Sequence, residues 1–264
     1  PADLVYLNYY RSRPFYPRRY PVLLPGIAAG VTFEHALRSA TTEVLERDAT
    51  SLWWHARLPA TRVNLPEEFF TAMGHHDRVR FSSDGLLLRT YDAGTPLFVA
   101  AFVLRDLEEG TIQVGFACRG SLCAALYKAA AEAWQLRRLT KAVRDPDSWA
   151  WRKTDGASPL PLLAAPPTAV PQLTQLVHNI QYYLDDRRAR RAYEMISETV
   201  RSDVNLDSES RPHVDTKLDL EKLRSSEGLD VYSHDVTTAD MRSTGYTVVR
   251  AYSPQACPNL PAAF

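Results

Sequence analysis

The chain has 264 residues, of which 45% are hydrophobic and 23% are charged, a balance typical of a soluble globular protein with a sizeable core. Its 31 basic and 31 acidic residues give a formal net charge of zero, so the bulk positive charge on which non-specific nucleic-acid binding depends is missing. The longest apolar runs, such as residues 96–104, are much shorter than the ~20 residues of a membrane span. We therefore expect neither nucleic acid nor a membrane as a partner.

The N-terminal part of the sequence predicts one long helix after a proline-rich segment. Prolines within the first thirty residues favour extended or looped backbone there. A helix is expected from about Thr32 to Trp54, because Thr32 suits the N-cap position and Glu34 places an acid in the first turn. A second, short helix is expected to begin at Pro66 and to end at Gly74.

The middle of the chain predicts an antiparallel meander followed by another long helix. Three apolar stretches are typical of strands: residues 86–88, 97–104 and 111–116. The turn signals beside them are Asp84-Gly85, Ala93-Gly94 and Glu109-Gly110. An alanine-rich helix is then expected from about Ser121 to Val143.

The C-terminal half predicts an irregular connection and then further helices. Prolines between residues 146 and 171 indicate a loop of a length that is usually functional or mobile. Helices are expected over 171–185 and 187–201, a charged helical segment near 217–224, and a last strand at 246–252. Strands flanked by helices, without regular βαβ alternation, indicate a mixed α/β (α+β) fold.

Several common catalytic sites are absent from the sequence. It contains no phosphate-binding P-loop, dinucleotide fingerprint, serine-hydrolase elbow or zinc-protease motif. The cysteines Cys118, Cys123 and Cys257 cannot all pair with one another and complete no zinc set, so we expect reduced thiols in a cytoplasm. The adjacent His75 and His76 are more typical of surface residues than of metal ligands.

One segment of the first helix concentrates side chains that carry chemistry. At 100° per residue, Ser39, Glu43 and Glu46 fall on one narrow stripe, and the opposite side is apolar. Carboxylates beside a hydroxyl suit a hard metal ion such as Mg²⁺, which prefers oxygen ligands and usually binds together with substrate phosphates. A solvated amphipathic helix with Arg47 beside the acids is the alternative interpretation.

The second long helix repeats part of this pattern. When the Ala-Leu pairs of the two helices are aligned, Glu132 takes the position of Glu43. Gln135 takes the position of the second acid, and Lys128 takes the position of Ser39. Two helices with matched acidic or amide stripes could face one another across a shared ligand, although alanine-rich helices also look alike by chance.

Together these segments resemble the YcaO-domain family. Ser39-x-x-x-Glu43-x-x-Glu46-Arg47, extended by Asp48-Ala49, resembles the family's first ATP-binding motif. The other similar segments are Gly115 through Ala125 to Glu132 and Gln135, then His178, Asp235-Val236-Thr237, and residues 245–250 with Pro254. They follow the family's order from about residue 26 to the end of the chain.

The resemblance implies a YcaO-like fold with antiparallel sheets and two matched helices around an ATP site that has no phosphate loop. It implies ATP and Mg²⁺ as cofactors. By match, the metal-linked carboxylates are Glu43, Glu46 and Glu132, and the nucleotide contacts are Ser39, Arg47, Gln135 and Arg250. No catalytic residue beyond this ATP site is assigned, because the chemistry needs no protein nucleophile.

The implied activity is the modification of peptide backbones in ribosomally made, modified peptides. In azoline-forming members, a Cys, Ser or Thr side chain of the precursor attacks the preceding amide carbonyl. ATP then phosphorylates the hemiorthoamide oxygen, and loss of phosphate leaves a thiazoline or oxazoline. Thioamide or macroamidine formation by the same ATP chemistry is an alternative, and so is a non-catalytic subunit that binds peptide or partner.

The resemblance also implies partners and a setting. These are a ribosomally made precursor peptide, an E1-like leader-binding protein and a second copy of the chain, in a bacterial cytoplasm. We expect residues 1–264 to form a single YcaO-like catalytic domain that is incomplete, because the N-terminal extension and C-terminal proline-rich tail of many members are not present. The cluster Arg187–Arg191 is expected to be a solvated helix face, with docking of an acidic leader peptide as the alternative.

Overall fold

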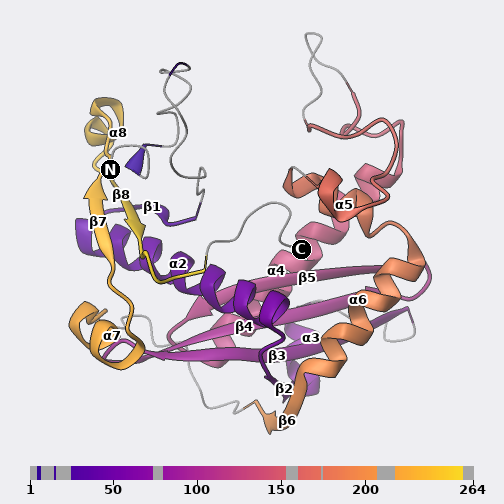
Figure 1. Ribbon diagram of the computed structural model, residues 1–264, viewed down its shortest axis with the longest axis horizontal. Coiled ribbons are helices and arrows are strands. Elements are labelled where there is room, and N and C mark those ends of the chain that lie inside the picture. Colours follow the sequence, from indigo (N-terminus) through magenta and orange to yellow (C-terminus); the bar gives the residue numbers. More distant parts are fainter. Residues whose placement is uncertain are drawn as a thin grey trace.

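Two β-sheets and one long helix that contacts both of them form the framework of the protein (Figure 1). The structure is a computed structural model, and it describes residues 5, 6, 15, 25–73, 80–152, 160–173, 175–206 and 218–257. In chain order the elements of these residues are β1 (Ile27–Gly30), α2 (Phe33–Ala56), β2 (Ala60–Asn64), α3 (Glu67–Ala72), β3 (Phe81–Asp92), β4 (Pro96–Asp106), β5 (Thr111–Arg119), α4 (Leu122–Arg144), a 3₁₀ turn (Val170–Gln172), α5 (Leu176–Tyr182), α6 (Asp186–Thr199), β6 (Val200–Asn205), α7 (Leu220–Glu227), β7 (Tyr232–Asp235), α8 (Ala239–Ser243) and β8 (Thr247–Tyr252). The larger sheet has the strand order β5-β4-β3-β2-β6 and the smaller sheet the order β1-β8-β7.

Both long helices begin where local sequence signals place them. The side chain of Thr32 caps α2 by accepting a hydrogen bond from the backbone N–H of His35 at 3.1 Å. The Ser121 hydroxyl caps α4 in the same way, with the N–H of Ala124 at 3.2 Å. Each cap satisfies one N–H that the first turn leaves without a partner, so both predicted starts are confirmed. None of the helices in the described part of the chain is long and apolar enough to cross a membrane.

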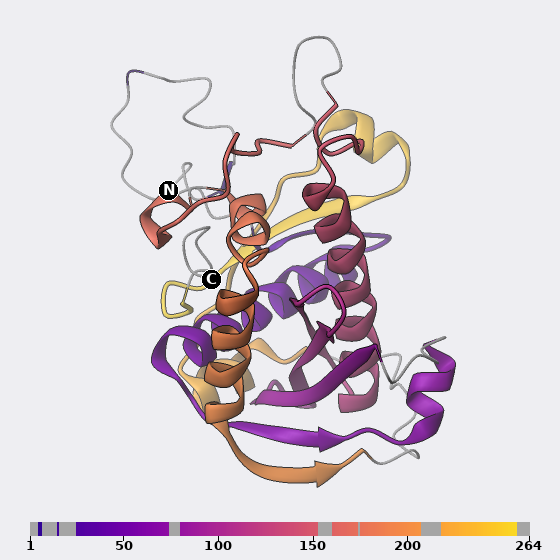
Figure 2. The same ribbon diagram turned by 90° about the vertical axis from the view of Figure 1, so that its right-hand side faces the viewer.

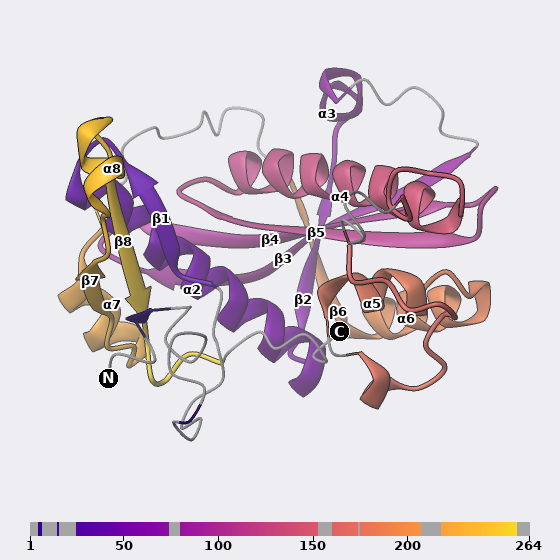
Figure 3. The same cartoon turned by 90° about the horizontal axis from the view of Figure 1, so that it is seen from above.

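Helices cover both faces of the large sheet (Figure 3). Helix α4 lies on one face, where its alanines and Leu126 pack against Phe102 and neighbouring strand residues. Helices α2 and α6 lie on the other face, where Trp53 packs in a cluster with Tyr91 and donates a hydrogen bond to the Thr199 hydroxyl at 2.9 Å. The alanines give α4 a flat surface, so its backbone lies close to the strands.

The predicted antiparallel meander is confirmed by β3, β4 and β5, which pair in that order. Strand β2 adds antiparallel to β3, whereas β6 lies parallel to β2 at the edge of the sheet (Figure 2). The large sheet therefore contains one parallel pair beside the expected antiparallel ones, and the small sheet is antiparallel throughout. The predicted mixed α/β fold class is confirmed.

One predicted turn is wrong. Asp84 and Gly85 lie inside β3, which continues through them in register with β4. The Asp84 carboxylate accepts a hydrogen bond from the Tyr193 hydroxyl of α6 at 3.0 Å. A Cβ on Gly85 would come within 3.1 Å of the side chains of Leu65 and Leu126. The glycine therefore makes room for close packing inside a strand and does not mark a turn.

The second half of the chain differs from its prediction in element boundaries. The helix expected over 171–185 is shorter, because a 3₁₀ turn precedes it and α5 begins only at Leu176. The helix expected near 217–224 is α7, which begins after Asp219, whose side chain accepts a hydrogen bond from the N–H of Lys222 at 2.9 Å. The last strand is confirmed as β8.

Five short elements were not predicted from the sequence: β1, β2, β6, β7 and α8. Each is only four to six residues long, so local propensity carries little information and tertiary pairing decides. Gly74, the predicted end of α3, lies outside the described residues, as do His75 and His76.

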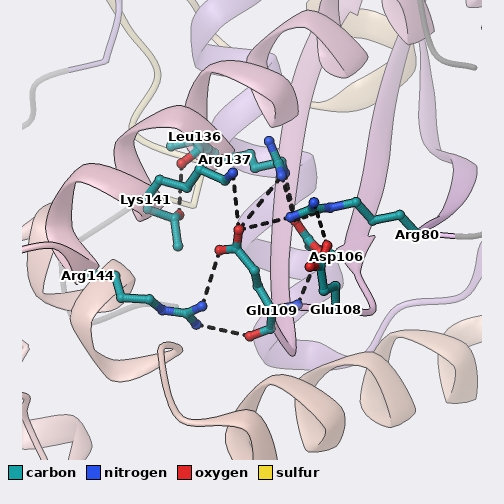
Figure 4. A network of polar contacts seen from close by, with 9 residues as sticks. Arg80, Asp106, Glu108, Glu109, Leu136, Arg137, Lys141 and Arg144 are labelled. Atoms are coloured by element: carbon teal, nitrogen blue, oxygen red, sulfur yellow. Dashed lines mark hydrogen bonds and ion pairs between the residues drawn. The ribbon is translucent and has the colours of Figure 1, made fainter. Parts of the chain in front are cut away.

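A buried ionic network fixes the C-terminal half of α4 to the turn between β4 and β5 (Figure 4). The fully buried Asp106 carboxylate accepts hydrogen bonds from Arg137 at 2.7 Å and from Arg80 at 3.1 Å. Beside it, Glu109 pairs with Arg144 at 3.2 Å. The network ties α4 to the end of the strands away from its N-cap and so fixes the direction of the helix.

Candidate functional site

The two long helices both contact the edge strand β5. A Cβ on Gly115 of β5 would lie 2.0 Å from the carbonyl oxygen of Ala129 and 2.6 Å from the backbone nitrogen of Ala133. Real Cβ atoms do not come so close to backbone, so only glycine permits α4 to pack at this distance. Glu132, which lies in the same helical turn as these two alanines, is thereby held next to the strand.

The first acid of α2 is tied to the small sheet. An Oε2 atom of Glu43 accepts a hydrogen bond from the backbone N–H of Gly26 at 2.9 Å. Gly26 has φ +90°, and a Cβ there would lie 2.2 Å from the carbonyl oxygen of Ala251. Nearby, Arg250 is only 1% exposed and donates a hydrogen bond to the carbonyl oxygen of Pro25. Burial lowers the pKa of Arg250, and the Glu43 carboxylate acts against that change.

The second acid of α2 is the most buried carboxylate of the site. Glu46 is 8% exposed, and its Oε1 lies 3.2 Å from Nη2 of Arg47. Burial raises the pKa of Glu46 to about 7, against the opposing effect of Arg47, and the negative charges of Glu132 and Glu43 raise it further. The charge of Glu132 on α4 therefore affects the protonation of Glu46 on α2.

The remaining predicted residues lie around this group of carboxylates. On α4, Oε1 of Glu132 lies 3.0 Å from Nζ of Lys128, and Gln135 is exposed almost one turn further along. On α2, Ser39 is half-buried about one turn before Glu43. All seven predicted positions thus belong to α2, α4 or the adjacent strand β8.

Arg119 was missed from the sequence. It is the last residue of β5, and its positive charge opposes the rise in the pKa of Glu46. Its Nη1 donates a hydrogen bond to the carbonyl oxygen of Cys118 at 2.6 Å. In the sequence, Arg119 stands between a predicted strand and the Gly120-Ser121 start of a helix. This position alone does not indicate a role, because the effect of Arg119 on Glu46 depends on how the fold places β5 and α2.

Two residues of the resembling segments hold the fold together. Asp48 is buried and accepts hydrogen bonds from the Tyr91 hydroxyl at 2.5 Å and from the backbone N–H of Cys257 at 2.7 Å. His178 is also buried, and its Nε2 lies 2.8 Å from the carbonyl oxygen of Pro161. Asp48 thus fixes the segment after β8 to α2, and His178 fixes the irregular connection to α5.

The donor set fits a metal ion that is bound together with phosphate. Within the described ranges, no group of three His, Cys, Asp or Glu side chains is placed to hold a metal ion by itself. Mg²⁺ is usually held by only one or two carboxylates, with phosphate oxygens and waters completing its shell. The buried Nε of Arg47 has no hydrogen-bond partner among the described residues, and such a donor suits an anionic oxygen.

The match to a known family decides what kind of protein carries this arrangement. The model of the YcaO cyclodehydratase family, described as ATP- and Mg²⁺-binding, matches residues 1–257. The chain belongs to this family. No curated protein sequence matches the chain.

Solved YcaO structures have the same fold. A heterocyclase in complex with substrate and cofactor is 19% identical with a TM-score of 0.61, over 92% of this chain and 30% of that chain. YcaO from Methanopyrus kandleri bound with AMPPCP and Mg²⁺ is 18% identical with a TM-score of 0.62, over 94% and 62% of the two chains. The E. coli microcin synthetase McbBCD complex with pro-MccB17 bound is 16% identical with a TM-score of 0.57, over 94% of this chain and 58% of that chain. This YcaO chain therefore spans less than two thirds of the length of each.

Proposed function

We propose that this YcaO protein binds ATP and Mg²⁺ between α2 and α4 and uses ATP to form thiazolines or oxazolines from Cys, Ser or Thr of a ribosomal precursor peptide. The observation that carries the proposal is that Glu46 of α2 is buried and that the charges of Glu43 on the same helix and of Glu132 on α4 both raise its pKa. The family description supports it, since it names both ATP and Mg²⁺.

The residues of the chain have distinct tasks in this proposal. The one or two carboxylates that would hold Mg²⁺ beside the phosphate oxygens are drawn from Glu43, Glu46 and Glu132. When bound, Mg²⁺ supplies positive charge to the phosphoryl group in transfer. Arg47 donates to a phosphate oxygen through the N–H groups that Glu46 does not use, and Arg250 keeps the segment before β1 in place.

The chemistry balances without a protein nucleophile. The thiol or hydroxyl of the precursor adds to the preceding amide carbon, and the former carbonyl oxygen takes the γ-phosphoryl group, which leaves ADP. The carbon–oxygen bond then breaks, phosphate departs with that oxygen, and the nitrogen loses its proton as the ring C=N bond forms. Phosphorylation thus converts hydroxide, a poor leaving group, into a good one, and the site needs only to position and stabilise charge.

A precursor peptide and a leader-binding partner are part of the proposal, as are a homodimer and a cytoplasmic setting. The solved microcin synthetase is a complex of several proteins with a bound pro-peptide, which supports partners of this kind here. With precursor and partner present, a precursor labelled with ¹⁸O at the cyclised carbonyl should transfer its label to inorganic phosphate. Label retained in the product would contradict the proposed chemistry.

Nucleotide binding is tested before turnover, because a missing partner cannot hide it. We expect calorimetry to detect binding of AMPPCP by the native chain and Mg²⁺ to strengthen this binding. E43A and E132A should each weaken it by at least about tenfold, through loss of a charged ligand contact. The control is E198A, since Glu198 is exposed on α6, and its affinity should equal that of the native chain. Absence of binding by the folded native chain would refute the proposed function.

A further inference from the structure

Two carboxylates of the site form ion pairs: Glu46 with Arg47 at 3.2 Å and Glu132 with Lys128 at 3.0 Å. The charge of Glu43 opposes the fall in the pKa of Arg250. Arg250 is buried, and the Nε of Arg47 is buried as well, so packing restricts both side chains. Lys128 differs, because its side chain is 44% exposed and carries a compact charge on a flexible four-carbon stem.

The charge of Lys128 breaks the similarity between the two helices. Lys128 occupies the position on α4 that corresponds to Ser39 on α2, so a full positive charge replaces a neutral hydroxyl. The ion pair of Lys128 with Glu132 does little to explain the lysine, since an exposed ion pair on a helix contributes little to folding stability. Lys128 also precedes Glu132 in sequence, which is the weaker of the two orientations of such a pair.

We propose that Lys128 is a built-in cation for the nucleotide: its ammonium, which pairs with Glu132 in this structure, turns to a phosphate oxygen when nucleotide binds. The inference rests on the proposed function. The exchange is favourable, because a polyphosphate carries more charge than the carboxylate that Lys128 leaves, and lysine is a common phosphate ligand. It also releases the Glu132 oxygen that Lys128 contacts in this structure.

A consequence follows for the metal requirement. Because Lys128 neutralises part of the phosphate charge, Mg²⁺ has less charge to neutralise than in a site with a hydroxyl at this position. Removing the ammonium should therefore weaken metal-free binding more than binding at saturating Mg²⁺. The measurable quantity is the factor by which Mg²⁺ strengthens nucleotide binding.

The test compares K128S, which copies the residue of α2, with K128R and with K141S. Lys141 is the matched control, because it lies on the same helix, is 45% exposed and pairs with Glu109 at 3.1 Å, outside the site (Figure 4). The dissociation constant of AMPPCP is measured by calorimetry in EDTA and over a series of Mg²⁺ concentrations. Circular dichroism checks that each variant is folded.

We expect K128S to weaken metal-free binding by about tenfold, the effect of one charge-assisted hydrogen bond, and saturating Mg²⁺ to restore most of the loss. K141S should match the native chain, and K128R should stay within about threefold of it, since the charge is kept. If Mg²⁺ strengthens nucleotide binding by the same factor in K128S and in the native chain, this inference is overturned but the proposed function is not. Absence of nucleotide binding by the native chain would overturn the proposed function as well.

Discussion

Glu46 is a buried carboxylate whose charged form lowers the stability of the fold. A carboxylate that is 8% exposed loses most of its hydration, and one arginine neighbour does not compensate fully, as its raised pKa of about 7 indicates. Nothing in the core requires an acid at this position. Perturbed carboxylates of this kind cluster at functional sites.

The substitution E46Q should separate stability from binding. The pKa in the fold lies above the ordinary value of 4.5, so the stability linked to Glu46 is present below about pH 4.5 and is lost as the pH rises through about 7. At pH 8 we expect E46Q to raise the free energy of unfolding of the nucleotide-free protein by about 1 to 3 kcal/mol, and nucleotide binding to fall. Urea unfolding at pH 8 and pH 4.5 measures the difference, which should vanish at the lower pH. A loss of stability at pH 8 would contradict this reading of Glu46.

The pKa of the buried Asp106 is lowered, in contrast to that of Glu46. Burial alone would raise the pKa of Asp106, but hydrogen bonds from Arg137 and Arg80 outweigh burial and lower it. Its contribution to stability is therefore present above pH 3.8, the ordinary value, and is lost as the pH falls further. We expect D106N to lower the free energy of unfolding at pH 7 by about 2 to 3 kcal/mol, because two arginines lose a buried partner. The exposed neighbour Glu108 supplies the control, E108Q, which should change it by less than about 0.5 kcal/mol.

At the scale of elements, the contact between α4 and β5 determines where Glu132 lies. We expect G115A to push α4 away from the strand and to lower the free energy of unfolding by about 2 kcal/mol or more, since the added methyl meets backbone at 2.0 Å. Nucleotide affinity measured by calorimetry should fall with it, because Glu132 moves with the helix.

The control for this prediction is G228A at the end of α7. Gly228 has φ +68° with no atom within 4 Å of an added Cβ, so alanine there causes backbone strain of about 1 kcal/mol and no clash. G228A should lower stability without altering nucleotide affinity. Equal affinity in G115A and the native chain would disprove the link between helix packing and the site.

Elements with local signals were predictable from the sequence, and elements without them were not. Thr32 caps α2 as predicted, and α4 begins after Ser121, near the predicted start, because capping needs only neighbouring residues. The Asp84-Gly85 signal failed because Gly85 serves packing against Leu126, a contact between distant segments. Strand β6 has five exposed residues and takes its register only from β2.

The same distinction holds for the site. The stripe of Ser39, Glu43 and Glu46 follows from helical periodicity, and the repeat on α4 pointed to Glu132, whose charge raises the pKa of Glu46. The sequence could not predict Arg119 or the glycine that lets α4 pack closely on β5, since their effects depend on pairing across the fold. It also gave no sign that Asp48 of the motif binds the segment after β8.

For the whole molecule, α2 is the element that unites the site. Its first half packs on the small sheet, where Glu43 bonds to Gly26, and its second half packs on the large sheet. Glu46 lies between these contacts, and the negative charge of Glu132 on α4 raises its pKa. A ligand held by both helices therefore connects the two sheets, and we expect it to stabilise both together.

A double-mutant cycle of E43Q and E132Q on the affinity for AMPPCP with Mg²⁺ tests most directly whether one ligand is shared by the two helices. The two residues lie on different helices, so additive losses are expected if they act separately. With a shared metal–nucleotide complex, each single substitution should weaken binding, and the second should cost at least about 1 kcal/mol less in the presence of the first. Strictly additive losses, or full affinity in either single variant, would contradict a nucleotide site built between α2 and α4.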